Sequence, residues 1–182
     1  MPRKKPAIIP VLRGILSLFV CAAVFPSCGY TLRGSGRFLA DNNIKTVYIP
    51  LFKNDTTRFQ IDLKLTEAVI NEFVTRGGVK VVPTAETADA TLEGEVLAFG
   101  VNPIAYSGNQ GSADRYSIII STSVTLRNLK TNAIIFSNPN YVYQSEYQVE
   151  EGTDFESQET TAMSDIAELF ARNLVVYILE GF

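Results

Sequence analysis

The sequence predicts a single α+β domain, a two-layer sandwich of two amphipathic helices packed on a four- or five-stranded mixed sheet. Three observations lead to this fold class. A strand, helix, strand order opens the domain between residues 44 and 82, and a clearly alternating strand follows over residues 116–126. An apolar stripe at helical spacing then runs over residues 163–178. Because the alternation leaves one side polar, we expect one face of the sheet to remain exposed to water.

A basic and then apolar leader precedes this domain. Arg3, Lys4, Lys5 and Arg13 accompany an apolar run over residues 12–25, which is the layout of a secretory signal peptide. The run is shorter than the roughly 20 residues that a helix needs to cross a bilayer. We therefore expect a removed signal peptide over residues 1–27 and no membrane-spanning helix.

Cys28 follows the leader, with the small residue Ser27 directly before it. The segment resembles a bacterial lipobox, although Phe25 and Pro26 are not its usual residues. We expect Cys28 to carry covalent diacylglycerol and N-acyl lipid. Each buried methylene of such chains contributes about 0.8 kcal/mol to membrane binding, so several chains would hold the protein on a membrane essentially permanently. The alternative is ordinary secretion after a cut near Ser27, which leaves Cys28 as a free thiol.

The composition excludes several classes of protein. Removal of residues 1–27 leaves twelve basic and nineteen acidic residues, a formal charge of −7, whereas nucleic-acid binding typically uses clustered Lys and Arg. The sequence contains no histidine, which is the commonest general base and metal ligand. Cys21 lies in the leader, so the folded part offers no pair of thiols. Most enzyme templates therefore fail, and we expect no metal site, non-covalent cofactor or disulfide.

Residues 28–43 are expected to form a lipidated N-terminal tether in front of a domain over residues 44–182. The glycines of this segment favour loose chain or turns. Phe38 and Leu39 are too apolar for a pure linker, so part of the tether is expected to dock on the domain or on a partner.

The first part of the domain reads as strand, turn and helix. Residues 44–52 alternate as a strand, and Pro50 should mark its end or an exposed edge. Thr57 and Gln60 match a capping box that opens a helix, and Gly77-Gly78 can take positive φ at its end. The apolar face expected for this helix contains Phe59, Leu63, Ile70, Phe73 and Val74, and Leu65 and Val69 flank it.

The remaining strands follow in order. Residues 79–82 form a short strand that should lie parallel to the first. A longer strand over residues 91–101 leads into a flexible loop predicted over residues 102–114, and long loops often serve binding. The alternating strand is followed by a return strand over residues 133–147, with a bulge or bend at residues 138–140.

A second capping box, Thr153 with Glu156, opens the last helix, which should pack beside the first. Its acidic residues suit the positive end of the helix dipole, so we interpret them as a solvated face rather than a metal or acid-base cluster. They are Asp154, Glu156, Glu159, Asp165 and Glu168. The apolar stripe contains Met163, Ile166, Ala167, Phe170, Leu174, Tyr177 and Ile178.

Five tyrosines are candidates for partner contact. Tyr141, Tyr143 and Tyr147 share one strand face, and Tyr106 and Tyr116 lie near the predicted loop. Tyrosine is amphipathic and frequent at interfaces. Cover of this strand face by a helix is the alternative that the sequence leaves open.

Three basic residues on or beside the sheet are candidates for contact with anionic phosphates. They are Arg115, Arg127 and Lys130, and guanidinium and ammonium groups bind phosphate through charge-assisted hydrogen bonds. The alternative for each is simple solvation.

The segment Cys28-Gly29-Tyr30-Thr31-Leu32-Arg33-Gly34 resembles the start of mature lipoproteins of the LptE family, which take part in lipopolysaccharide assembly. Members typically open with Cys-Gly, an aromatic residue, a variable residue and then Leu-Arg. The order of elements is also similar, so the resemblance extends over nearly the whole mature chain.

The resemblance implies a lipid-anchored outer-membrane protein that is not an enzyme. Its domain would face the periplasm and plug a large β-barrel partner of the LptD type in a 1:1 complex, assisting barrel assembly and lipopolysaccharide delivery to the outer leaflet. Family members are thought to bind lipopolysaccharide through basic residues near the sheet and its loops. The corresponding loop here, residues 105–114, has no Lys or Arg, which leaves Arg115, Arg127 and Lys130 as substitutes.

An auxiliary lipoprotein of another envelope transport complex, of the ABC type, is the alternative function. Such a chain can also begin with a strand that ends in Pro before a polar turn and a helix. An envelope hydrolase is a third class, for which only carboxylates, Lys and Tyr are available as bases. The identity of the partner separates the first two functions.

Overall fold

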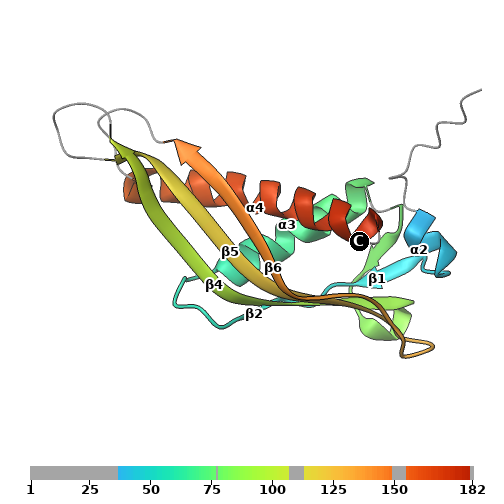
Figure 1. Cartoon of the computed structure of the whole chain (residues 1–182). Coiled ribbons are helices and arrows are strands. Elements are labelled where there is room, and N and C mark those ends of the chain that lie inside the picture. Colours follow the sequence, from blue (N-terminus) through green and yellow to red (C-terminus); the bar gives the residue numbers. More distant parts are fainter. Residues whose placement is uncertain (1–36, 77, 107–112, 149–154, 181–182) are drawn as a thin grey trace, which may run out of the picture. The chain divides into compact units, whose positions relative to one another are not determined.

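The computed structural model describes residues 37–76, 78–106, 113–148 and 155–180. Within them, a six-stranded mixed sheet carries the helices α3 and α4 side by side on one face (Figure 1). The predicted two-layer α+β sandwich is confirmed. The sheet has more strands than predicted because the first predicted strand resumes beyond Pro50 as a separate short strand.

The strand order is β3-β1-β4-β5-β6, with β2 also beside β4. β1 (Thr46–Tyr48) pairs in parallel with both β3 (Lys80–Val82) and β4 (Ala90–Tyr106). The parallel pairing with β3 is the one that the strand, helix, strand order predicts. β2 (Lys53–Asn54) pairs further along the same edge of β4. A short 3-10 helix, Ala85–Thr87, connects β3 to β4.

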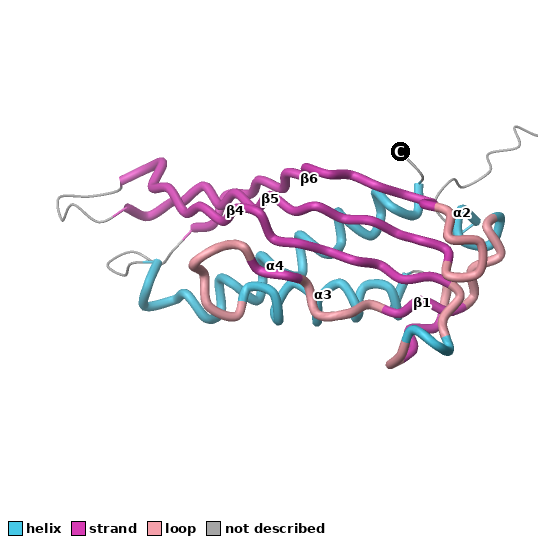
Figure 2. Tube along the Cα trace, turned by 90° about the horizontal axis from the view of Figure 1, so that it is seen from below, coloured by secondary structure: helices cyan, strands magenta, loops and turns pink. Residues whose placement is uncertain are grey.

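β4, β5 (Ala113–Asn128) and β6 (Ile134–Gln148) form a long antiparallel meander (Figure 2). The register between β5 and β6 is irregular at one predicted place. Thr122 pairs with Tyr141 and Val124 pairs with Asn138, so β6 holds one more residue than β5 in this interval. The bulge expected at residues 138–140 is therefore confirmed.

The loop predicted over residues 102–114 is wrong at both ends. Residues 102–106 continue β4 and residues 113–114 begin β5. Pro103, which suggested a break, is tolerated because the ladder with β5 is irregular between Pro103 and Ala105, and a register irregularity is where a strand accommodates a missing N–H group.

The alternation of β5 sorts its side chains between the two faces of the sheet. Ile118, Ile120, Val124 and Leu126 are fully buried in the core beneath the helices, as predicted. Their neighbours in sequence point to the other face, which we call the open face. Residues of the open face include Glu93, Glu95, Ser117, Ser121, Ser123, Thr125, Val142 and Gln144.

α3 (Ile61–Arg76) begins later than predicted, so the capping box of Thr57 and Gln60 is wrong. The preceding turn has its own hydrogen bonds, because the N–H and the hydroxyl of Thr56 both donate to Asn54 Oδ1, at 2.9 and 2.7 Å. Gln60 has a φ of 57°, outside the helical region. The helix begins only after this residue.

The predicted apolar face of α3 is also wrong in most positions. Phe59 precedes the helix and is 81% exposed, and Leu63 and Val74 are exposed as well. Ile70 is partly buried and only Phe73 is fully buried. The face that packs in the core lies on an adjacent stripe and contains Ile61, Leu65, Thr66, Ala68, Val69 and Phe73.

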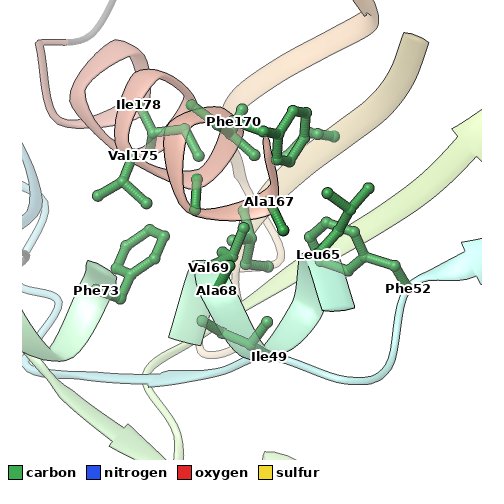
Figure 3. Close-up of a cluster of buried hydrophobic side chains, with 14 of the residues drawn as sticks. Ile49, Phe52, Leu65, Ala68, Val69, Phe73, Ala167, Phe170, Val175 and Ile178 are labelled. Carbon is green, nitrogen blue, oxygen red and sulfur yellow. The ribbon is translucent and has the colours of Figure 1, made fainter. Parts of the chain in front are cut away.

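α4 (Phe155–Glu180) runs as predicted, and its apolar stripe is buried, with Tyr177 packed partly buried against the core. It lies beside α3, and Lys64 Nζ donates to Ser164 Oγ at 3.3 Å. Figure 3 shows side chains of α3 and α4 meeting above those of the β1–β2 segment. The capping residue Thr153 lies outside the described residues, as do the side chains of residues 155–160.

α2 (Arg37–Asp41) lies within the predicted tether and contacts α4. Leu39 is fully buried and Phe38 packs partly buried against the core, which confirms that this part of the tether docks on the domain. Cys28 and the signal peptide lie outside the described residues. None of the helices in the described ranges combines the length and the hydropathy of a membrane span.

Candidate functional site

The open face of the sheet is not covered by α3 and α4, which pack on the opposite face, and it is rich in hydroxyl groups. Thr125 Oγ1 and Ser137 Oγ lie 3.2 Å apart across neighbouring strands. Gln144 Nε2 donates to Ser117 Oγ at 3.2 Å. Hydroxyl and amide groups can both donate and accept hydrogen bonds. The groups of this face can therefore replace their hydrogen bonds to water with hydrogen bonds to a polar partner.

A groove opens on this face beside the β1–β2 segment, and we call it the edge groove. Tyr48 pairs with Thr91 and Lys53 pairs with Glu95, so five steps along this edge match four steps along β4. The extra residue produces a bulge. The groove has a volume of about 310 Å³ and is lined by Pro50, Leu51, Lys53, Glu93, Gly94, Glu95, Ser123 and Thr125.

Contacts of Phe52 with the core hold the β1–β2 segment, which forms one wall of the edge groove, in place. Phe52 is buried, and its backbone N–H donates to Thr66 Oγ1 of α3 at 3.0 Å. Its ring lies against Gly94, where an added Cβ would come within 2.6 Å of the ring atoms. Leu51, the preceding residue, is 57% exposed at the rim. The bulge thus turns one large side chain inward and its neighbour outward.

The end of the β4–β5 hairpin carries exposed apolar and aromatic groups. Ile104 is exposed and Tyr106 is 63% exposed. Tyr116 lies opposite Tyr147 in the register of β5 and β6, and both are partly buried against the core. Of the five candidate tyrosines, Tyr106 is therefore the most accessible.

Tyr141 and Tyr143 lie under α4. Tyr143 is 8% exposed and meets Phe170 edge-on at 5.9 Å between ring centroids. Tyr141 packs between Phe170, at 5.9 Å, and Tyr177, at 5.6 Å. Burial, with smaller contributions from Tyr143 and Tyr177, raises the pKa of Tyr141 to about 12. Cover by a helix thus accounts for these two rings, and their contact with a partner stays a prediction.

Arg115 and Arg127 are not brought together. They lie twelve residues apart on β5, which corresponds to about 40 Å along a strand. Arg115 Nη1 lies 3.8 Å from Glu146 Oε2, and Arg127 Nη1 donates to the carbonyl oxygen of Asn132 at 3.4 Å. Both groups have local partners on the surface, and phosphate contact stays a prediction for each.

Lys130 takes part in a cluster around Asp89 that the sequence analysis missed. Asp89 Oδ2 accepts from the N–H groups of Lys45 and Thr46, at 2.9 and 3.0 Å, and from Thr46 Oγ1 at 3.0 Å. Lys130 Nζ lies 2.5 Å from Asp89 Oδ1. These donors, the Lys130 ammonium first and the Lys45 N–H second, hold the pKa of the Asp89 carboxyl well below its usual range. No local pattern could reveal this cluster, since its members are more than forty residues apart.

The geometry offers no metal centre in residues 37–76, 78–106, 113–148 and 155–180, where no group of three or more Cys, Asp or Glu side chains is placed to hold an ion. Asp165 and Glu168 are exposed on α4, in line with a solvated face. Their predicted companions Asp154, Glu156 and Glu159 lie outside the side chains that the structure describes.

Comparison with known protein families identifies the chain. The family model LptE, Lipopolysaccharide-assembly, matches residues 44–178. The chain belongs to the LptE family. Membership in this family of non-catalytic assembly lipoproteins gives the chain a role in lipopolysaccharide assembly and associates it with the outer membrane. A search of curated proteins found no match.

Several solved structures are similar to this chain at low sequence identity. A protein from Xanthomonas campestris is 11% identical, with a TM-score of 0.52 over 75% of this chain and 85% of that chain. Rare lipoprotein B from Shewanella oneidensis is 14% identical, with a TM-score of 0.41 over 75% and 92% of the two chains. PelC from Paraburkholderia phytofirmans, solved as a dodecamer, is 13% identical, with a TM-score of 0.40 over 68% and 86%. The first of these likenesses supports the fold alone.

Proposed function

We propose that this LptE-family chain is the lipoprotein subunit of an outer-membrane lipopolysaccharide translocon. Its domain plugs a large β-barrel partner of the LptD type in a 1:1 complex, helps that barrel to assemble, and supports delivery of lipopolysaccharide to the outer leaflet. The observation that carries the proposal is the family match over residues 44–178.

The open face supports a place inside a barrel. The interior of a large transmembrane barrel is polar and hydrated, so a plug should present hydrogen-bonding groups rather than an apolar surface. The middle of the open face does so through Ser121, Ser123, Thr125 and Gln144. On the opposite face of the sheet, α3 and α4 already cover the apolar core of the domain. The domain can therefore enter such a lumen as a folded unit.

Lipid on Cys28 supports the location. Several acyl chains on one residue hold a protein on a membrane almost permanently. Arg37, where α2 begins, lies nine positions after Cys28, and a chain of this length spans at most about 30 Å. The domain would therefore stay close to the periplasmic surface of the outer membrane, within reach of a barrel lumen.

Direct contact with lipopolysaccharide belongs to the same proposal. Arg115 lies opposite Ala105 in the register of β4 and β5, and the next residue of β4, Tyr106, is exposed. A guanidinium group and an exposed amphipathic ring at the same end of the sheet suit a ligand that combines phosphate with apolar chains. Arg127 and Lys130, at the other end of the sheet, would meet a separate part of such a ligand or the barrel wall.

Affinity co-purification tests the proposal. Full-length tagged protein is recovered from detergent-solubilised membranes of its host, with Cys28→Ala as the control that cannot be lipidated, and the partners are identified by mass. We expect a large outer-membrane barrel in near-equal amount that survives washing, and much less of it with Cys28→Ala. Recovery of inner-membrane ABC transporter subunits instead would favour the auxiliary-lipoprotein function.

A further inference from the structure

We propose that the edge groove receives one Lys or Arg side chain from a segment of the protein partner. The inference rests on the proposed function only for the identity of that partner as a barrel. Besides Lys53, the groove is lined by two carboxylates, two hydroxyls and an apolar rim, and each of these three features matches one part of a long basic side chain.

The carboxylates are placed to receive a cation. Glu93 and Glu95 lie two residues apart on β4 with their side chains on the open face, and Thr125 and Ser123 lie directly across from them in the register of β5. The Cα atoms of Glu93 and Glu95 are therefore about 7 Å apart along the strand. Hydroxyl groups flank the two carboxylates as further acceptors.

These charges have no strong partner in the described part of the chain. Lys53 is the register partner of Glu95 on β2, yet no ion pair within 4 Å joins Lys53 to Glu93 or Glu95. The groove is lined by two negatively charged residues, Glu93 and Glu95, and by one positively charged residue, Lys53. Since the mature chain also has a formal charge of −7, its field favours the approach of a basic segment.

The apolar rim of the groove offers a contact surface for the aliphatic stem of the incoming Lys or Arg side chain. Pro50 and Leu51 line the groove on the side of the bulge, and Leu51 is more than half exposed. Lys and Arg bury their aliphatic stems along apolar surface while the charged head stays with polar groups. Leu51, Glu93 and Glu95 line the same groove, so a stem that lies on Leu51 would direct its charged head toward the two carboxylates.

The groove is small and pre-formed. Its volume of about 310 Å³ is at the lower end of the range for small-molecule pockets, which suits one side chain and its neighbours. Phe52, held between Gly94 and Thr66, fixes the bulge that creates the rim. A rigid groove avoids the cost of ordering loops on binding.

Photo-crosslinking in the living host tests this inference. The full-length protein carries p-benzoylphenylalanine at Leu51, and a matched protein carries it at Val74, which is also exposed but lies near the end of α3. We expect Leu51 to crosslink to a peptide that holds a Lys or Arg within about five residues of the crosslink, and Val74 to give no such product.

Charge reversal completes the test. Glu93→Lys with Glu95→Lys should lower the yield of the Leu51 crosslink by about tenfold, because like charges then face the incoming cation. Glu67→Lys with Glu168→Lys, which changes the net charge equally at exposed helix positions, should leave the yield unchanged. If the reversed variant does not fold, Glu93→Gln with Glu95→Gln decides the question with side chains of the same shape.

Each outcome is decisive. A crosslink that survives loss of both carboxylates, a product with lipid only, or no protein product from Leu51 overturns the inference while the barrel can still co-purify. A carboxylate-dependent crosslink to a basic segment of a protein other than a barrel supports the inference and contradicts the proposed function.

Discussion

Asp89 joins three segments that are distant in the sequence. Its carboxylate accepts hydrogen bonds from Lys45 and Thr46 at the start of β1 and faces Lys130 in the turn after β5. Hydrogen bonds to a charged group contribute about 1.5–3 kcal/mol each. We expect Asp89→Asn to lower the free energy of unfolding by about 2 kcal/mol at pH 7, measured by chemical denaturation.

The loss should depend on pH in a definite direction. The Lys130 ammonium and the Lys45 N–H hold the pKa of Asp89 below its ordinary value, so its contribution is fully present above about pH 4 and declines as the pH falls further. The gap between wild type and Asp89→Asn should therefore narrow at acid pH. A gap that widens there would contradict the account. Lys130→Met, which keeps the backbone donors, should cost less than Asp89→Asn.

Gly94 is required by a close approach rather than by a turn. A Cβ at this position would lie 2.6 Å from ring atoms of the buried Phe52. Overpacking of this kind typically costs about 1–3 kcal/mol, so we expect Gly94→Ala to lower the free energy of unfolding by that amount. In a Phe52→Leu background the same change should cost clearly less. Equal costs in the two backgrounds would show that the contact is not the cause.

At the scale of elements, one hydroxyl connects α3 to the β1–β2 segment. Thr66 Oγ1 accepts from the N–H of Phe52 and donates to the carbonyl oxygen of Asp62, at 3.0 and 2.6 Å. Thr66→Val leaves a buried N–H without its partner, which costs about 1–3 kcal/mol. Thr66→Ser keeps the hydroxyl and should cost less. Hydrogen exchange of the Phe52 amide should accelerate in the valine variant and stay protected in the serine variant, and the reverse order would refute the role of the hydroxyl.

The packing of α4 on β6 can be followed through one phenol. Burial against α4 raises the pKa of Tyr141 to about 12, above the ordinary value near 10. The contribution of the buried, neutral Tyr141 phenol to the free energy of unfolding is thus fully present below about pH 10 and is lost as the pH rises through 12. When tyrosine ionisation is followed by ultraviolet absorbance, the titration should show one ionisation step near pH 12. The Tyr141→Phe variant should lack this step. Persistence of that step in the variant would mean that another tyrosine is responsible.

The helices show why some elements could be predicted from the sequence and others could not. In α4 the apolar residues lie on one stripe, so pattern and structure agree. In α3 two neighbouring stripes are apolar, and Leu63 and Val74 on one compete with Leu65 and Val69 on the other. Tertiary packing decides which stripe faces the core, and it buries Leu65 and Val69.

For the whole molecule, the layers and most strands were predictable because alternation and helical spacing are local properties of the chain. The candidate site was not, because the edge groove results from a bulge that is visible only when Lys53 is paired with Glu95. The same holds for the surroundings of Tyr141 and Tyr143, where β6 placed the rings on one face but only the packing of α4 showed what covers them.

A native mass spectrum of the complex purified from outer membranes tests the central claim most directly. The account predicts one barrel of the LptD type with one copy of this chain, the latter beginning at Cys28 and heavier than its polypeptide by the mass of a diacylglycerol and an N-acyl group. A chain recovered without a barrel, or with inner-membrane transporter subunits, would contradict the proposed role. An unmodified Cys28 would contradict the anchor.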